Sequence, residues 1–287
     1  MTQTGSALKH AGRKTEEKLD ELASHPWIER IARFGYATKG VVYMVVGALA
    51  LLTALGLGGD MTNKQGALRI IAAQPYGKAM LIVIGFGLIG YVVWRLVQSI
   101  ADADQKGRKL KGLAVRTAYA ISGLVYAGLA WTSMQIVFDY ASSNDDGDAP
   151  KDWTARLMSV PYGRWLVIAV GAGIIGFGLY QIYKGYKAKF RKRLKSGEMQ
   201  ETMDTWATWS GRFGYAARGI CFDIIGVFLV QAAWYFNPDQ AIGLDGALLA
   251  LAQTRYGPWL LGLIALGLFT YGFYMLVEAR YRRIAGA

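Results

Sequence analysis

Long apolar runs alternate with polar, charged connections along most of the chain. Six runs are long enough for a helix to cross about 30 Å of hydrocarbon once an apolar turn is added at either end. The runs are Val41–Leu57, Ala79–Trp94, Thr117–Phe138, Trp165–Tyr183, Gly219–Phe236 and Pro258–Val277. The soluble core of a 287-residue chain does not need six such runs. The pattern therefore predicts an all-α integral membrane protein with six transmembrane helices.

Shorter amphipathic patterns lie between the long runs. Three precede even-numbered runs, at Ala67–Ala73, Trp153–Val160 and Ala247–Ala252, and predict short interfacial helices on the outer surface. Met199, Met203 and Trp206 recur at i, i+4 and i+7, which predicts an amphipathic helix leading into the fifth run. Thr15–Ser24 is a similar piece before the first run.

The chain contains three copies of one unit. Arg33–Tyr43 recurs as Arg212–Phe222 and, more weakly, as Arg116–Tyr126, and a Tyr-Gly pair precedes each even-numbered run. Three tandem helical hairpins with the same orientation predict a pseudo-threefold arrangement about an axis along the membrane normal. The predicted divisions are a polar N-terminal segment 1–30, hairpins 31–105 and 106–195, and an amphipathic helix with the third hairpin 196–287.

These openings, each an R-x-G-Y-x-x-x-G-like sequence, resemble the bacterial family of domain of unknown function 1206. The resemblance covers nearly all of the chain after about Trp27. The motif is thinner in the second unit, where Thr117-Ala118 replaces Phe-Gly. The resemblance implies a membrane fold, and it supplies no activity, substrate or catalytic residue.

Charge is distributed unevenly between the two sets of connections. Segments 58–78, 139–164 and 237–256 hold seven basic and eight acidic residues, whereas the rest of the chain holds 25 basic and 12 acidic residues. The positive-inside rule then places both termini and the two basic connections in the cytoplasm. We therefore expect a multi-pass protein of the bacterial inner membrane.

Residues that carry common catalytic chemistry are scarce. The chain has one cysteine, Cys221, and both histidines, His10 and His25, lie in the N-terminal segment. No nucleophile–base pair or metal-ligand cluster is evident, so we expect no catalytic residue, no metal site, no cofactor and no enzymatic activity.

Gly85–Gly90 spells G-x-G-x-x-G after an apolar run, the fingerprint of a dinucleotide-binding turn, with Asp102 and Asp104 downstream. A second copy lies at Gly171–Gly176, but the aligned position in the third unit is Thr270. A phosphate-binding turn does not readily accept that threonine, whereas a helix contact accepts any small residue. The sequence therefore predicts helix packing and no bound dinucleotide.

Small residues recur on one face of most predicted spans, where they allow close helix contact. In odd-numbered runs these are Gly40, Gly47, Gly123, Gly219 and Gly226, and in even-numbered runs Gly87, Gly90, Gly173, Gly176 and Gly267. We expect these glycines to pack against neighbouring helices.

Asp223 is a carboxylate inside the fifth apolar run. It lies on the same face as Gly219 and Gly226, and a charge there needs a partner from another helix, water or a proton. We expect a pair with Lys39 or a tyrosine hydroxyl, and the alternative is a functional intramembrane site involving Asp223, Lys39 and Arg218.

Arg33, Arg116 and Arg212 lie at the inner ends of the odd-numbered spans. They either reach lipid phosphates or gather with Lys39 and Arg218 around the axis as a cationic vestibule for an anion. The second basic connection carries Lys187, Lys189, Arg191, Lys192 and Arg193. Its position directly beside a span favours anionic lipid at the cytoplasmic face over nucleic acid, and a membrane-protein partner stays open.

Two functions fit these observations. The first is a non-catalytic scaffold or accessory subunit that contacts lipid and a larger membrane complex. The alternative is a small-solute or ion transporter, or a channel, with its site on the pseudo-threefold axis.

Overall fold

The computed structural model describes residues 25–58, 63–107, 109–138 and 149–283. Within these residues the fold is helical and contains no strand. Six helices are long and apolar enough to cross a membrane: α2 (Pro26–Ala54), α4 (Gly77–Ile100), α5 (Leu110–Val137), α7 (Gly163–Tyr186), α8 (Glu201–Trp234) and α10 (Gly257–Tyr281). This result confirms the predicted all-α membrane protein with six spans. The N-terminal piece Thr15–Ser24 lies outside the described residues.

The odd-numbered spans begin well before the apolar runs that predicted them. α2 begins at Pro26 and α8 at Glu201, whereas the corresponding runs begin at Val41 and Gly219. Polar residues in these early turns, such as Thr38, Lys39 and Ser210, are buried inside the protein. A hydropathy pattern ends at such residues, although the helix continues through them.

Short helices precede each even-numbered span, as the sequence predicts: α3 (Lys64–Ala72), α6 (Ala149–Met158) and α9 (Leu244–Ala252). The chain then turns sharply at the Tyr-Gly pair. Tyr76 and Tyr162 both have φ of 64°, and a side chain on Gly77 would collide with the carbonyl oxygens of Ile71 and Ala72. The repeated glycine is therefore required where the backbone of the short helix meets the next span.

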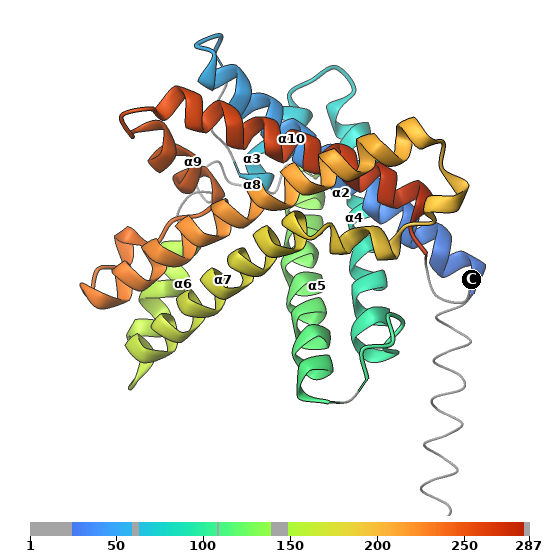
Figure 1. The fold of residues 1–287 in the computed structure, drawn as a ribbon. Helices are drawn as coiled ribbons and strands as arrows, with labels where there is room; N and C mark the ends of the chain where they lie inside the picture. Colours follow the sequence, from blue (N-terminus) through green and yellow to red (C-terminus); the bar gives the residue numbers. More distant parts are fainter. Residues whose placement is uncertain (1–24, 59–62, 108, 139–148, 284–287) are drawn as a thin grey trace, which may run out of the picture.

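The six spans form three antiparallel pairs that run in different directions in Figure 1: α2 with α10, α4 with α5, and α7 with α8. α2 also packs against α4, and α8 packs against α10. α5 and α7 form no comparable interface within the described residues. The helices therefore follow a ring in the order α2, α4, α5, α7, α8 and α10, open between α5 and α7, which fits the pseudo-threefold repeat.

Apolar and polar residues are distributed as expected for a bundle in lipid. Tyrosines such as Tyr36, Tyr91 and Tyr274 are almost fully buried, while Phe86 and Leu124 are 61% and 70% exposed at the middle of their spans. A soluble protein rarely leaves such large contiguous apolar surfaces in water. We call the end that carries α3, α6 and α9 the outer end, and the end that carries the α4–α5 and α7–α8 connections the inner end.

Most of the glycines singled out in the sequence lie at helix contacts. Gly40 and Gly47 face α10, Gly219 and Gly226 face α7, Gly87 and Gly90 face α2, Gly267 faces α8, and Gly123 faces the Arg95 side chain of α4. A Cβ at Gly173 or Gly176 would meet no atom within 4 Å. In the repeat these two positions correspond to Gly87 and Gly90 in the first unit and to Gly267 and Thr270 in the third. Gly87, Gly90 and Gly267 pack within their own hairpins, whereas the open side of the ring leaves Gly173 and Gly176 without a neighbour.

Candidate functional site at the axis

Lys39 of α2 lies in a cage of tyrosine rings. Its side chain is among the most buried in the chain, at 2% exposure, and its Nζ donates a hydrogen bond of 3.0 Å to the Tyr91 hydroxyl. The Nζ lies 4.8 Å from the centre of the Tyr91 ring, 5.2 Å from that of Tyr126 and 5.6 Å from that of Tyr271. Aromatic faces attract cations, most strongly where water is excluded. The rings therefore surround the Lys39 amine at a place far from bulk water.

Arg218 of α8 extends toward the same rings. Its Nη1 donates a hydrogen bond of 3.0 Å to the Tyr271 hydroxyl, and its Cζ lies 5.1 Å from the centre of the Tyr271 ring and 5.0 Å from that of Phe222. Its Nε is buried and has no hydrogen-bond partner among the described residues. Donor groups left unpaired in this way are costly unless a ligand or water satisfies them.

No carboxylate of the described residues forms an ion pair with Lys39 or Arg218. Both cations lie near the rings of Tyr43 and Tyr271. The structure thus places two basic side chains together inside the bundle. We call this group, made of Lys39, Arg218, Tyr43, Tyr91, Tyr126 and Tyr271, the axial site.

The axial site is assembled from equivalent positions of the three units. Lys39 and Arg218 occupy the same position in the first and third units, where the second unit has Ser122. Tyr91 and Tyr271 are likewise equivalent, with Phe177 in the second unit. Helices related by a pseudo-threefold axis bring equivalent residues toward that axis, which explains why residues far apart in sequence meet here.

A cavity of about 460 Å³ leads toward the axial site from the outer end. Residues of α3, α5, α6 and α9 line this cavity, and Lys64 and Tyr126 are among them. The Lys64 Nζ lies 4.9 Å from the centre of the Tyr126 ring and 5.2 Å from that of Tyr43. Asp245 also lines this cavity, so its rim carries both signs of charge.

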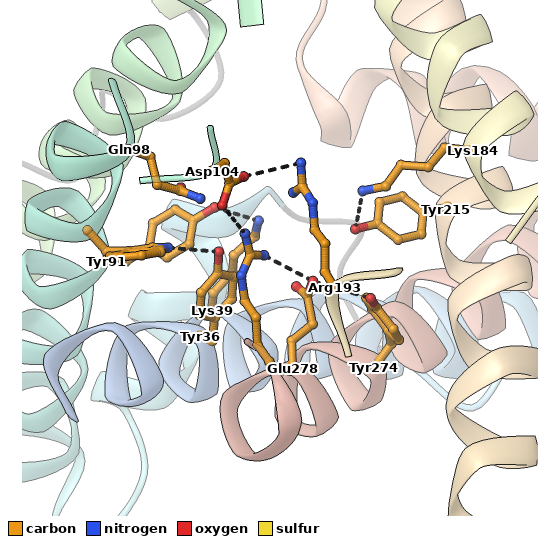
Figure 2. Close-up of polar contacts among 12 residues, drawn as sticks. Tyr36, Lys39, Tyr91, Gln98, Asp104, Lys184, Arg193, Tyr215, Tyr274 and Glu278 are labelled. Atoms are coloured by element: carbon orange, nitrogen blue, oxygen red, sulfur yellow. Dashed lines mark hydrogen bonds and ion pairs between the residues drawn. The ribbon is translucent and has the colours of Figure 1, made fainter. Parts of the chain in front are cut away.

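At the inner end, Asp104, Arg193, Glu278 and Arg282 form what we call the inner polar cluster. Asp104 is 3.3 Å from Arg193 and 3.5 Å from Arg282, and Glu278 is 3.1 Å from Arg282. Figure 2 shows Asp104, Arg193 and Glu278 converging from separate parts of the bundle, with Lys184 and Tyr215 on one side. Glu278 and Arg282 lie one helical turn apart, and both side chains are buried because the connection that carries Arg193 covers them.

Asp104 lies between α4 and α5, outside the spans. Burial by itself raises the pKa of its carboxyl, but Arg282, Arg193 and the hydroxyl of Tyr119 together lower that pKa well below its usual range. Tyr119 donates a hydrogen bond of 2.7 Å to the carboxylate. Asp104 is therefore ionised at neutral pH and fixes two arginines across the inner end.

Arg95 connects the two groups of charges. Its Nε donates a hydrogen bond of 2.8 Å to the Tyr91 hydroxyl of the axial site, and its Nη1 donates one of 2.9 Å to Gln98. The Cζ also lies 5.0 Å from the centre of the Tyr119 ring, which contacts the inner polar cluster. Basic and tyrosine side chains thus alternate from the outer cavity to the inner end.

Asp223 does not join Lys39 and Arg218. Its carboxylate lies against Gly178 of α7, in the space that a side chain at that position would need. The expected pair with Lys39 or a tyrosine hydroxyl is absent from the described contacts, because Asp223 points into the α7–α8 interface. Lys39 and Arg218 are brought together without it.

The arginines at the inner ends of the odd-numbered spans are separate from the axial site. Arg33 donates to the carbonyl oxygens of Ala279 and Arg280 at the end of α10, and Arg116 donates to those of Ser99 and Ile100 at the end of α4. A cation there satisfies free carbonyls and interacts favourably with the helix dipole. Arg33 and Arg116 therefore link neighbouring helices through hydrogen bonds. Arg212 instead lines a cavity beside α7.

The basic connection after α7 divides its charges among several partners. Lys189 lies over the Tyr183 ring, Arg191 pairs with Asp204, and Arg193 reaches inward to Asp104. Lys187 lines the cavity beside α7, and Lys192 is exposed. Sequence reasoning grouped these residues as lipid contacts and missed the inward role of Arg193, which depends on the turn at Ala188, with φ of 47°.

Sequence reasoning also missed Asp104, the buried tyrosines and Glu278 as members of one polar network. The repeated tyrosine of the Arg-x-x-Tyr openings, namely Tyr36, Tyr119 and Tyr215, was the available signal. Among the residues that the structure describes, no three histidine, cysteine or acidic side chains gather as metal ligands do.

Comparisons with known proteins agree with the repeat. The sequence model of the Domain of Unknown Function (DUF1206) family matches three tandem segments, residues 34–102, 117–188 and 213–282. The chain is similar to "Uncharacterized protein YxxB" of Bacillus subtilis (strain 168), with 38% identity over 259 residues that cover 90% of this chain and 93% of that protein. No solved structure matches the chain.

Proposed function

The chain belongs to the DUF1206 family, whose description gives no activity, and we propose that it is a membrane transporter that carries a small anion along its pseudo-threefold axis. The proposal places it in the bacterial inner membrane with both termini in the cytoplasm, as the charge of its connections favours. It requires no covalent chemistry, cofactor or metal.

One observation carries the proposal: Lys39 and Arg218 lie together inside the bundle without a carboxylate partner among the described residues. A guanidinium keeps its charge in proteins, and an unpaired charge in a low-dielectric interior is costly. An anion between these two side chains would offset that cost and would accept a hydrogen bond from the unpartnered Arg218 Nε.

The arrangement of charge along the axis supports entry from the outer end. Lys64 stands at the outer cavity, and Lys39, Arg218 and Arg95 follow it inward. Inward of Asp245, which lines the outer cavity, the described acidic side chains along this path lie at the inner end, where Asp104 and Glu278 are paired with arginines. An anion that moves inward would compete with these carboxylates for Arg193 and Arg282, which offers a way to open the inner end as the anion arrives.

The scaffold or accessory role is the competing proposal. In that role the hydrogen bond to Tyr91 and the surrounding tyrosine rings are the only partners that the Lys39 amine needs, and the axial site binds no ligand. The two proposals differ in whether solute crosses the membrane, so a flux measurement separates them.

The test is uptake by proteoliposomes of labelled chloride, inorganic phosphate or succinate, three anions of different size and charge. We expect one of them to be taken up above protein-free liposomes. Arg218→Gln should reduce that uptake about tenfold or more, because a charge-assisted hydrogen bond contributes on the order of 1.5–3 kcal/mol. Lys39→Gln should act in the same direction.

Arg255→Gln is the matched control, because Arg255 is an exposed cation at the outer end, away from the axis. It should leave uptake unchanged. Monodisperse elution in detergent establishes that each variant is folded. Folded protein that takes up none of the three anions would favour the accessory role, and equal uptake by native protein and Arg218→Gln would remove the axial site from the pathway.

A further inference from the structure

A second cavity, of about 730 Å³, lies between the end of α7 and the early turns of α8. Its walls combine cations with aromatic and aliphatic groups: Lys187, Arg212, Tyr186, Trp209, Phe213 and Ile182. Tyr186 and Trp209 are 74% and 64% exposed, on the part of the surface where the spans reach the inner end. This cavity shares no residue with the axial site, so what it binds is independent of the proposed transport.

Arg212 departs from its counterparts in the other two units. Arg33 and Arg116 each donate to two carbonyl oxygens at the end of a neighbouring span. Arg212 forms no such hydrogen bond or ion pair with the described residues, and its exposed side chain lines the cavity with Lys187.

The end of α7 explains the difference. The carbonyl oxygen of Gly185, equivalent to Ser99 and Ala279 in the other units, already accepts a hydrogen bond of 3.0 Å from the Ala188 amide. The chain turns there into the 3₁₀ segment η1 (Lys189–Arg193), so its own backbone satisfies the helix end. Arg212 is left with its donors available to an external partner.

We infer that this cavity binds the phosphate headgroup of an anionic phospholipid. Lys187 and Arg212 provide two cations for one phosphodiester, and a guanidinium binds phosphate oxygens through paired donors. Tyr186 and Trp209 are ring types that occupy the headgroup layer. Ile182 and Ala216 continue the cavity along the spans with apolar surface that an acyl chain can cover.

The experiment compares the retention of phosphatidylglycerol and phosphatidylcholine by the full-length protein in mild detergent, using native mass spectrometry over a lipid titration. We expect preferential retention of phosphatidylglycerol. Arg212→Gln and Lys187→Gln should each weaken it about fivefold, the effect of one basic residue at an anionic membrane surface. Because the Arg212 side chain forms no hydrogen bond or ion pair with the described residues, Arg212→Gln should elute as the native protein does.

Lys192→Gln is the matched control, since it removes one exposed charge from the same connection outside the cavity. It should retain the lipid as the native protein does. Three results would overturn the inference: equal retention of both lipids, equal phosphatidylglycerol retention by the double variant of Arg212 and Lys187, or an equal loss in Lys192→Gln. Displacement of the lipid by inorganic phosphate at the same concentration would also overturn it, because the site would then recognise a free anion.

Discussion

Asp104 is the acidic residue on which the inner end of the bundle depends. It lies in a connection between two spans, where a carboxylate is usually solvated, yet its side chain is only 12% exposed. Two arginines and a tyrosine hydroxyl surround it. Buried ion pairs of this kind are costly to break because the remaining charges stay buried without a partner.

Asp104→Asn should therefore lower the free energy of unfolding by about 3 kcal/mol at pH 7. The native pKa of Asp104 is lowered, so its contribution is fully present above the pKa of the unfolded chain, about 4, and is lost as the pH falls further. The difference between native protein and variant should thus be constant from pH 7 to about 5 and shrink below about 4. Thermal unfolding in detergent, followed by tryptophan fluorescence, measures this difference.

Asp239→Asn is the control for that series, because Asp239 is an exposed carboxylate at the outer end. It should change the unfolding temperature little at any pH. A constant difference between native protein and Asp104→Asn down to pH 3 would show that the carboxylate charge is not the stabilising element.

At the scale of the helix, close contact between α7 and α8 depends on glycines seven residues apart. Gly219 and Gly226 of α8 face the carbonyl oxygens of Gly178 and Gly171 of α7. Seven residues are nearly two turns, so both contacts lie on one face of each helix. Backbones can approach this closely only where side chains are absent.

Gly226→Leu should destabilise the protein by about 2–3 kcal/mol or prevent its assembly, because the new side chain would collide with Ile175 and the Gly171 carbonyl. Gly176→Leu is the matched substitution on the open face of α7, where a Cβ meets nothing within 4 Å. It should be tolerated. Yield and unfolding temperature in detergent compare the two, and equal damage by both would mean that α7 also packs on a helix at Gly176.

At the scale of the whole molecule, the spans that the structure describes form a ring that is closed except between α5 and α7, which share no comparable interface. The repeat predicts that α5 packs against α7 inside the second hairpin, as α2 packs against α4 and α8 against α10. Among the described residues this interface is missing. The second unit also carries the thinnest copy of the repeated motif, with Thr117-Ala118 in place of Phe-Gly.

The orientation of the ring in the membrane is a prediction of the charge pattern. Alkaline phosphatase fused after residue 145, in the connection before α6, should be active, whereas the same enzyme fused after Ala287 should be inactive. A green fluorescent protein fusion should give the opposite result at each site. Active phosphatase at the C-terminus would reverse the assignment and place Lys64 and the outer cavity in the cytoplasm.

The sequence alone determined the six spans, the short helices and the threefold repeat, because each of these is a local pattern of hydropathy or of repeated small and aromatic residues. It did not determine the true starts of α2 and α8, since Lys39 and Ser210 interrupt the pattern while the helix continues.

The tertiary structure decided which polar residues meet. Lys39 and Arg218 lie 179 positions apart in the numbering, and only helix packing brings them to the same tyrosine rings. Helical periodicity places a side chain on a face but does not say which helix that face meets. For that reason Asp223, the most conspicuous intramembrane charge in the sequence, lies in a helix interface, whereas Asp104 holds the inner polar cluster together.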